Sequence, residues 1–254
     1  MPTQMLLARA RGLWEDLARM PGAFGPQGAV NVVVSPQSGL CPPGWVGAVT
    51  LGGSALVTVG SESTAVIVRD ALTTLPVGLV ADAAAVRSVL PVTATLGPAT
   101  LSYVSPAGFR PAAAPPAVDQ LSSRHEGVRA LQEWAGRDDA AEAALEEVTS
   151  PVFAIHEDGR VVAAAGYRAW PRRTAHLSVL TAPERRGCGL ARATASAAVA
   201  HALAAGLLPQ WRARTAASWR VAAASGFEEL GAQLSLELGR EKPPASPAPG
   251  GPAR

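Results

Sequence analysis

The stretch PERRGCGLARA, residues 183–193, combines charged and flexible residues in a pattern that could bind an anion. Gly187 and Gly189 allow backbone conformations that other residues rarely adopt, so nearby N–H groups can turn toward a ligand. Arginines flank both glycines, and the alanine-rich segment that follows favours a helix, whose N-terminal end carries partial positive charge. The stretch therefore predicts a site for a phosphate or pyrophosphate group.

Two common phosphate-binding loops do not fit this stretch. A Walker loop requires Gly-Lys-Ser/Thr, and no lysine is present here. A dinucleotide fingerprint requires Gly or Ala at the sixth position counted from Gly187, where this chain has Arg192. The preceding strand also belongs to a predicted antiparallel meander instead of a parallel βαβ unit. Both interpretations are excluded.

The second half of the sequence shows clear periodicity around this loop. The elements predicted before it are helices at 123–136 and 138–148 and antiparallel strands at 151–156, 161–170 and 174–181. The elements predicted after it are a helix to about residue 205, a strand at 209–214, a helix at 216–225 closed by Gly226, and a strand at 231–238. This order indicates an α+β fold with a mixed sheet.

The first half of the sequence predicts a smaller α/β unit. Its helices are expected at 3–20, 61–74 and 80–90, with Ser61 as the cap of the second helix. Its strands are expected at 30–34, 46–51, 55–59 and 99–104. The stretch RPAAAPPAV, residues 110–118, has no core-forming pattern and is typical of a connector. We therefore expect an N-terminal domain over 1–110, a Pro/Ala-rich linker at 111–118, a second domain over 119–239 and a disordered tail at 240–254.

Composition narrows the class of protein. The hydrophobic fraction of 48% and charged fraction of 17% are typical of a folded soluble protein, and the net charge of +2 gives no reason to expect nucleic-acid binding. No stretch is apolar and long enough to span a bilayer, and the first residues lack the features of a signal peptide. The two cysteines are far apart and form no metal-binding spacing. We expect a cytoplasmic protein without a bound metal.

The loop and its neighbours resemble the GNAT superfamily of acyl-CoA-dependent N-acyltransferases. The stretch RGCGLA, residues 186–191, resembles the family's R/Q-x-x-G-x-G/A signature, and HLSVLT before it and WRARTAASWRVAAASGFEELG after it are similar to the flanking motifs. The likeness covers about residues 120–238. It is greatest to bacterial members with an additional N-terminal domain, which have a comparable stretch at Gly206, Leu207, Pro209 and Trp211. The implied fold is a mixed, mostly antiparallel sheet flanked by helices. Whether residues 1–110 form a diverged half of the same fold stays open.

The resemblance implies acetyl-CoA, or coenzyme A, as the cofactor. Residues that would hold its pyrophosphate are Arg186, Gly187, Cys188, Gly189, Leu190, Ala191 and Arg192. Residues that would pair with its pantetheine arm, and polarise the thioester carbonyl, are Val179, Leu180 and Thr181. Thr215 and Ser218, in the following motif, are also expected beside the cofactor. Cys188 is interpreted as a loop side chain and not a nucleophile, because it lies where pyrophosphate should bind.

Candidate catalytic residues lie on the strands before the loop. His176 and Ser178 share one strand face, at positions where the resemblance implies acidic residues in other members. His176 is a candidate general base, with a hydrogen-bonded sheet histidine as the alternative. In other members of the family, a tyrosine commonly protonates the leaving thiolate, but this chain has Ala222 at that position. Tyr167 and Ser218 are weak candidates to replace it. The residue that donates this proton therefore stays open. A packing role for Tyr167 is the alternative to catalysis.

These features together predict an N-acetyltransferase. The resemblance implies that the acetyl group moves from acetyl-CoA to a primary amine by direct attack in a ternary complex. One alternative is a non-catalytic acyl-CoA-binding or regulatory module, and another is an interaction protein that has lost the cofactor. The sequence does not identify the acceptor, which is a small molecule or a peptide. The acyl chain length and the oligomeric state also stay open, and a homodimer is one candidate for the latter.

Overall fold

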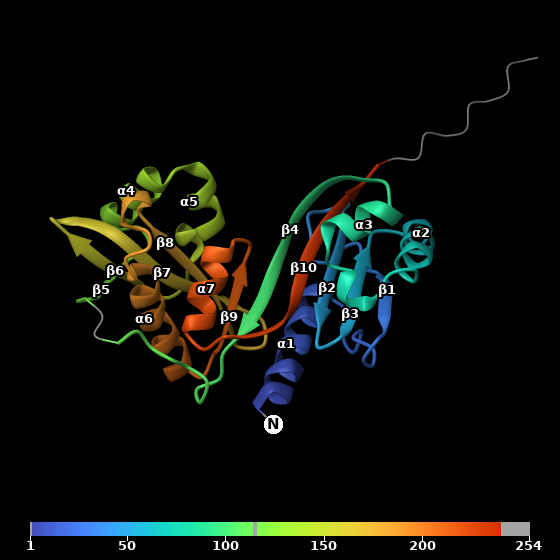
Figure 1. Ribbon diagram of the computed structural model, residues 1–254, viewed down its shortest axis with the longest axis horizontal. Coiled ribbons are helices and arrows are strands. Elements are labelled where there is room, and N and C mark those ends of the chain that lie inside the picture. The colour runs from blue at the N-terminus through green and yellow to red at the C-terminus, as the bar shows by residue number, and fades with distance from the viewer. Residues whose placement is uncertain (1, 114–115, 240–254) are drawn as a thin grey trace, which may run out of the picture.

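The computed structural model of the protein describes residues 2–113 and 116–239, so the tail predicted at 240–254 lies outside the described residues. Within these residues, one ten-stranded sheet has the order β1-β3-β2-β10-β4-β9-β8-β7-β6-β5 (Figure 1). The neighbours β1/β3 and β8/β9 are parallel, and the other pairs are antiparallel. The predicted mixed, mostly antiparallel sheet flanked by helices is therefore confirmed.

The N-terminal half, residues 2–110, supplies one side of this sheet. Its elements are α1 (Pro2–Ala18), β1 (Val30–Val34), β2 (Val46–Leu51), β3 (Ser54–Val59), α2 (Glu62–Leu72), α3 (Ala83–Val89) and β4 (Val92–Tyr103). Ser61 caps α2 as predicted, because its hydroxyl accepts a hydrogen bond from Thr64 N at 3.2 Å. The helix predicted at 80–90 begins only at Ala83, because the Asp82 carboxylate caps it by accepting from Ala85 N at 2.7 Å.

The C-terminal half, residues 119–239, supplies the other side. Its elements are β5 (Asp119–Leu121), α4 (Glu126–Ala135), α5 (Arg137–Ala143), β6 (Val152–Glu157), β7 (Arg160–Trp170), β8 (Thr174–Thr181), α6 (Leu190–Ala204), β9 (Leu208–Ala213), α7 (Ala216–Ala224) and β10 (Glu228–Leu238). The helix predicted at 138–148 ends at Ala143, because Ala144 adopts a left-handed conformation with φ of 45°. A short 3-10 turn follows and buries Leu145 completely.

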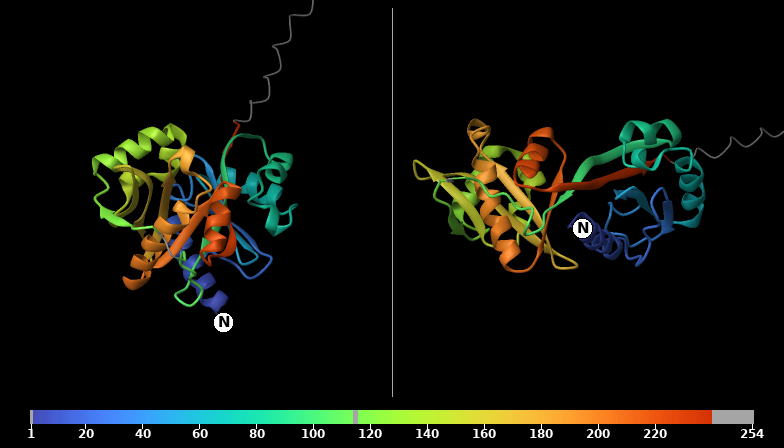
Figure 2. Two further views of the ribbon diagram at one scale, coloured as in Figure 1. Left: turned by 60° about the vertical axis from the view of Figure 1, so that its left-hand side comes forward. Right: turned by 60° about the horizontal axis from the view of Figure 1, so that its bottom comes forward.

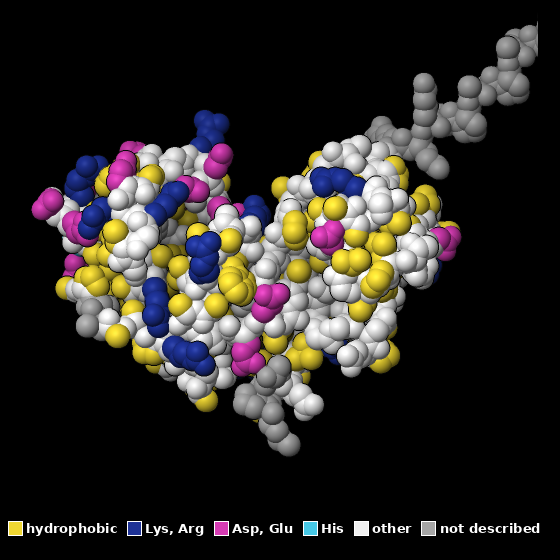
Figure 3. Space-filling model, viewed as in Figure 1, with side chains coloured by type: hydrophobic (Ala, Val, Ile, Leu, Met, Phe, Trp, Pro, Cys, Tyr) yellow, Lys and Arg dark blue, Asp and Glu magenta, His cyan; other side chains and the backbone are white. Residues whose placement is uncertain are grey.

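Helices cover both faces of the C-terminal strands. Val128 and Leu131 of α4 pack with Leu180 of β8, whereas Ala198 of α6 packs with Leu177 of β8. Because side chains alternate along a strand, these contacts place α4 and α6 on opposite faces. Figures 1 and 3 show the two halves as separate lobes, with a narrower region between them. None of the helices in the described part of the chain is long and apolar enough to cross a bilayer.

Strand β10 joins the halves. It lies between β2 and β4, both from the N-terminal half, and the view at the right of Figure 2 shows β4 and β10 running side by side between the lobes. Leu234 and Leu236 of β10 are fully buried in the core of the N-terminal half, in one cluster with Val57 and Val68. The last strand of the C-terminal half therefore completes the core of the first half. The domain boundaries at 110 and 119 stay a prediction.

Strand β4 is longer than the 99–104 segment that the sequence indicates. Gly97 and Pro98 look like a break, because proline cannot donate a hydrogen bond to a neighbouring strand. They occupy a register shift, where Ala99 pairs with Gln233 but Leu96 pairs with Ser235. The irregularity in the pairing accommodates the proline, so the strand extends from Val92 to Tyr103. Strand β10 likewise begins earlier than predicted, at Glu228.

Replacing Gly231 with alanine should destabilise the protein at this junction. Gly231 pairs with Leu51 of β2 and Leu101 of β4, and a Cβ on it would lie 1.7 Å from the Thr50 carbonyl oxygen. We expect Gly231→Ala to lower the free energy of unfolding by at least about 2 kcal/mol in urea titrations. Gly60→Ala is the matched control, because no atom lies within 4 Å of a Cβ at that position. Equal urea midpoints for the two variants would contradict the role assigned to Gly231.

Candidate functional site

Strands β8 and β9 diverge in the middle of the sheet. They pair only at Thr174↔Leu208, Ala175↔Pro209 and His176↔Gln210. Beyond these pairs, β8 stays with β7 as far as Thr181, whereas β9 pairs along its other edge with β4. Along residues 177–181, no described strand pairs with the edge of β8 that faces β9. Its backbone N–H and C=O groups are therefore available to an extended ligand.

The glycine loop follows directly at the open end of this divergence. Gly187 and Gly189 have φ values of 79° and 80°, and no atom lies within 4 Å of where either would carry a Cβ. Gly189 is the N-cap of α6 and provides no side-chain oxygen to the first N–H groups of that helix. The loop thus exposes a helix N-terminus that can accept an anion, as the sequence predicts.

The three arginines around the loop have partners within the protein. Arg185 Nη2 lies 2.6 Å from Glu157 Oε1, and Arg186 Nη2 lies 2.5 Å from Asp139 Oδ2. Arg192 donates to the carbonyl oxygens of Arg110 and Pro111, at 3.4 and 3.3 Å, and so contacts the connector. The pair between Arg186 and Asp139 is about half exposed, and such pairs are weak. A bound phosphate could therefore displace the aspartate.

His176 lies where the two strands begin to diverge. Its Nδ1 is 2.5 Å from Gln210 Oε1, and its ring stacks on Trp170 with centroids 4.1 Å apart. Because an amide oxygen can only accept, Nδ1 donates the proton and Nε2 keeps a free lone pair. Burial, helped by the positive charge of Arg212, lowers the pKa of His176 from 6.5 to about 4. The imidazole is therefore neutral at pH 7.

A buried polar chain continues from His176 into the N-terminal half. Gln210 is fully buried and pairs across the sheet with Tyr103 of β4. The Tyr103 hydroxyl accepts a hydrogen bond of 2.6 Å from Trp14 Nε1 of α1, and burial raises its pKa. Trp14 also packs edge-to-face against Trp170, with centroids 6.3 Å apart. Residues of both halves thus hold His176 in place.

Two hollows flank β9. One, of about 300 Å³, lies between the two halves and is lined by Trp14, Leu40, Trp170 and Arg212, among others. The other, of about 390 Å³, is lined by residues of β4, β9, β10 and the start of α7, including Thr215 and Trp219. No group of three or more His, Cys, Asp or Glu residues in the described ranges is placed to hold a metal ion.

Comparison with known proteins agrees with this geometry. Residues 152–232 match the family model of the GNAT acetyltransferases. That part of the chain, the GNAT domain, is therefore similar in sequence to these acetyltransferases. The matched range contains the diverging strands, the glycine loop and α7. No curated protein matches the chain.

Several solved structures are similar to the chain at low sequence identity. A GNAT-family acetyltransferase from Colwellia psychrerythraea is 16% identical, with 61% of this chain and 60% of that chain covered and a TM-score of 0.45. A GCN5-related N-acetyltransferase from Kribbella flavida is 18% identical, with coverages of 61% and 62% and a TM-score of 0.45. A structure from Salmonella typhimurium with its cofactor acetyl-CoA is 18% identical, with coverages of 48% and 92% and a TM-score of 0.37. The match spans about three fifths of the first two proteins.

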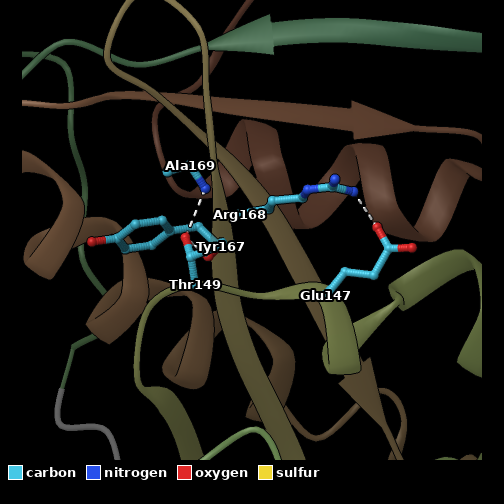
Figure 4. Close-up of polar contacts among 5 residues, drawn as sticks. All are labelled: Glu147, Thr149, Tyr167, Arg168 and Ala169. Atoms are coloured by element: carbon cyan, nitrogen blue, oxygen red, sulfur yellow. Dashed lines mark hydrogen bonds and ion pairs between the residues drawn. The ribbon is translucent and has the colours of Figure 1, made fainter.

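Within the GNAT domain, the predicted catalytic residues fall on two faces of the sheet. His176 pairs with Arg168 of β7, so His176, Ser178 and Arg168 share the face that α4 covers. Tyr167 points to the opposite face, where its hydroxyl lies 2.9 Å from His201 Nδ1 of α6. Figure 4 shows Tyr167 and Arg168 on opposite sides of β7, with Arg168 ion-paired to Glu147. The structure therefore brings His176 and Ser178 together but separates Tyr167 from them.

The predicted cofactor residues lie along the divergence and the loop. Val179, Leu180 and Thr181 belong to the open edge of β8, and Cys188 is exposed in the loop. Two hydroxyls of the next motif have local partners. Thr215 Oγ1 caps α7 by accepting from Ser218 N at 3.2 Å, and Ser218 Oγ accepts from Trp211 Nε1 at 2.9 Å. Ala222 is buried in the core beneath α7, so the GNAT domain has no hydroxyl at that position.

Four residues around this site were not predicted from the sequence: Gln210, Tyr103, Trp170 and Arg212. The segment Gln210 to Arg214 alternates polar and apolar residues within a strand that the structure buries. That alternation could have indicated that Gln210 and Arg212 share one face. Tyr103 and Trp170 carry no such local signal, because their roles arise from pairing between distant segments.

The low pKa of His176 should make stability depend on pH. The folded protein keeps His176 neutral down to about pH 4, whereas the unfolded chain protonates it near 6.5. The contribution of the neutral imidazole to the free energy of unfolding is therefore complete above about pH 6.5 and is lost progressively as the pH falls toward 4. We expect the difference in unfolding free energy between wild type and His176→Gln to shrink by about 2 kcal/mol from pH 7.5 to pH 5. The measurement is urea unfolding of both proteins at each pH. A difference that does not change with pH would show that the imidazole is not held neutral.

Proposed function

We propose that the protein transfers an acetyl group from acetyl-CoA to a primary amine by direct attack in a ternary complex. The observation that carries this proposal is the divergence of β8 and β9 immediately before a glycine loop at the start of α6. An open strand edge and a positive helix end, in that order, suit a long ligand with a pyrophosphate. The match of residues 152–232 to the GNAT acetyltransferase family supports the same chemistry.

The residues present fit the cofactor that the family implies. The N–H groups of 187–191 would hold the pyrophosphate, because both glycines leave open space above the loop. Val179, Leu180 and Thr181 would hydrogen-bond the pantetheine arm along the open edge of β8. Acetyl-CoA supplies an activated thioester carbonyl. A backbone N–H of this edge would stabilise negative charge on the carbonyl oxygen during attack.

His176 is the side chain best placed to accept the proton of the attacking amine. Its Nε2 carries the free lone pair, and its ring lies where β8 and β9 part. A base with a pKa of about 4 cannot readily deprotonate a free alkylammonium ion. However, the nitrogen becomes more acidic as its bond to the carbonyl carbon forms, and a neutral imidazole can then take the proton, directly or through water. Ser178, on the same face, would hydrogen-bond within this site.

One observation favours a second candidate function. Ala222 is 1% exposed and lies at the position where the family commonly has a tyrosine acid. A GNAT domain without that group could bind acyl-CoA as a regulatory module without turnover. In the catalytic proposal, water protonates the leaving thiolate, which is a fair leaving group.

Binding of acetyl-CoA should raise the melting temperature of the protein. A ligand at a hundredfold excess over its Kd stabilises the native state by about 2.7 kcal/mol, which corresponds to a shift of roughly 5 °C or more for a chain of this size. We expect Gly189→Asp to abolish the shift, because it places a carboxylate where the pyrophosphate would bind. The double variant Arg186→Glu with Gly189→Asp should behave in the same way.

Gly28→Asp is the matched control for strain. Gly28 has a φ of 86° and no atom within 4 Å of a Cβ, as Gly189 has, but it lies in the N-terminal half. It should lower the melting temperature to a similar extent and keep the shift with acetyl-CoA. A folded wild type that shows no shift would refute coenzyme binding, and a shift without thiol release on any amine would favour the regulatory module.

His176→Gln should reduce turnover much more than Tyr167→Phe. Loss of a general base lowers kcat by about 10²–10⁴-fold, whereas the Tyr167 hydroxyl is bonded to His201 beneath α6 and should matter by no more than a few fold. The measurement is thiol release at saturating acetyl-CoA and amine. An equal or larger loss in Tyr167→Phe would instead assign the proton transfer to Tyr167.

A further inference from the structure

We propose that the 300 Å³ cavity between the two halves binds an oxyanion, carboxylate or phosphate, on a small apolar molecule, and that Arg212 anchors this anion. The inference rests on the proposed function in one respect, because it takes that molecule to be the amine that accepts the acetyl group. The acceptor would then carry an amine, an apolar body and an acidic group.

The charge of Arg212 is only partly compensated by the described residues. Arg212 is largely buried, and its hydrogen bond is a long one, 3.4 Å from Nη1 to the neutral Gln233 Oε1. Arg214, the other arginine that lines the cavity, is ion-paired with Glu142 at 2.7 Å. No Asp or Glu is among the described residues that line it. Burial and the neighbouring Arg214 charge lower the pKa of Arg212, and the weaker effect of the Glu142 carboxylate, which is ion-paired to Arg214, opposes this. Among the described residues, no carboxylate forms an ion pair with Arg212 itself.

A guanidinium in this setting suits an oxyanion. Its parallel N–H groups match two oxygens of a carboxylate or phosphate, and such charge-assisted bonds are stronger than bonds between neutral groups. An anion beside Arg212 would compensate a charge that the fold keeps from water. The structure thus contains a largely buried cation that has no direct anionic partner among the described residues.

The walls and size of the cavity indicate the rest of the ligand. Trp14, Trp170, Leu40 and Leu96 provide apolar and aromatic surface. A volume of about 300 Å³ is at the lower end of the range for small-molecule sites. The cavity therefore fits a compact aromatic or aliphatic body and not an extended peptide.

The cavity is connected to the candidate catalytic residue. Trp170 lines it and stacks on His176, and Arg212 lies two residues beyond Gln210 on the same face of β9. An acceptor held by its anion at Arg212 would therefore extend toward the point where β8 and β9 diverge. The Arg212 charge also helps to depress the pKa of His176, so an anion there would raise that pKa and make the imidazole a better base.

Binding can be tested without turnover, through tryptophan fluorescence of the full chain. Phenylacetate and phenyl phosphate are the anionic probes, and benzyl alcohol is the neutral probe of similar size. We expect a saturable fluorescence change with at least one anion, because Trp14 and Trp170 line the cavity. Benzyl alcohol should bind at least tenfold more weakly. The two anions distinguish a carboxylate site from a phosphate site.

Variants locate the site. Arg212→Gln should weaken binding of the anionic probe roughly ten- to a hundredfold, and Arg212→Lys, which keeps the charge, should restore part of it. Arg124→Gln removes the same charge from an exposed position before α4 and should change nothing. Equal binding of benzyl alcohol, absence of any binding to folded wild type, or unchanged affinity in a folded Arg212→Gln would each overturn the proposal.

A turnover assay tests whether the ligand is the acceptor. With acetyl-CoA, phenylalanine should show a KM at least tenfold below that of phenethylamine, and Arg212→Gln should remove this preference. Equal KM values in the wild type would overturn the acceptor assignment.

Gly189→Asp separates the two proposals, because it should abolish the acetyl-CoA shift but leave binding of phenylacetate intact. A missing acetyl-CoA shift with intact phenylacetate binding refutes the acetyltransferase proposal alone, and the reverse result refutes the anion site alone.

Discussion

The candidate site depends on a limit to hydrogen bonding between two strands. β8 and β9 share only the pairs from Thr174↔Leu208 to His176↔Gln210. Each strand has a partner on its outer side, β7 for β8 and β4 for β9, and these partners continue after the shared pairs end. The opening is thus held by hydrogen-bonded neighbouring strands on both sides. The protein gives up only the hydrogen bonds that β8 and β9 would otherwise make with each other. Since β4 comes from the N-terminal half, the opening in the GNAT domain is shaped by residues outside it.

The same junction concentrates polar groups that a purely structural core would avoid. Gln210 and Tyr103 are fully buried, His176 stacks under Trp170, and Arg212 lies beside them. Buried polar and charged groups often stabilise less than apolar residues of the same size would. Their presence at one point, where both halves and the diverging strands meet, is explained more readily by ligand chemistry than by stability. Tryptophans from α1 and β7 enclose the cluster and limit its access to water.

Local signals in the sequence predicted the local parts of this arrangement. The strand at 174–181, the glycine loop, the Ser61 cap and the Gly226 ending follow from alternation, backbone freedom and capping, which act over a few residues. Pairing between distant segments carries no such signal. Because of Gly97 and Pro98, the first part of β4 was not predicted as a strand. Nothing near residue 231 indicates that β10 pairs with strands of the N-terminal half. The separation of Tyr167 from His176 likewise depends on the β7–β8 register, which alternation within each strand does not define.

The position of β10 has a consequence for biosynthesis. A chain emerging from the ribosome presents β2 and β4 long before residue 238 is made, and each then has an unpaired edge that only β10 fills. Such edges can pair with other chains. Multidomain proteins commonly fold their first domain while the next is being made, but here the core around Val57 and Val68 lacks Leu234 and Leu236 until β10 itself has been made. The two halves must therefore complete their folding together. During synthesis, the sheet of the first half either stays incomplete until β10 is made or needs its unpaired strand edges to be protected.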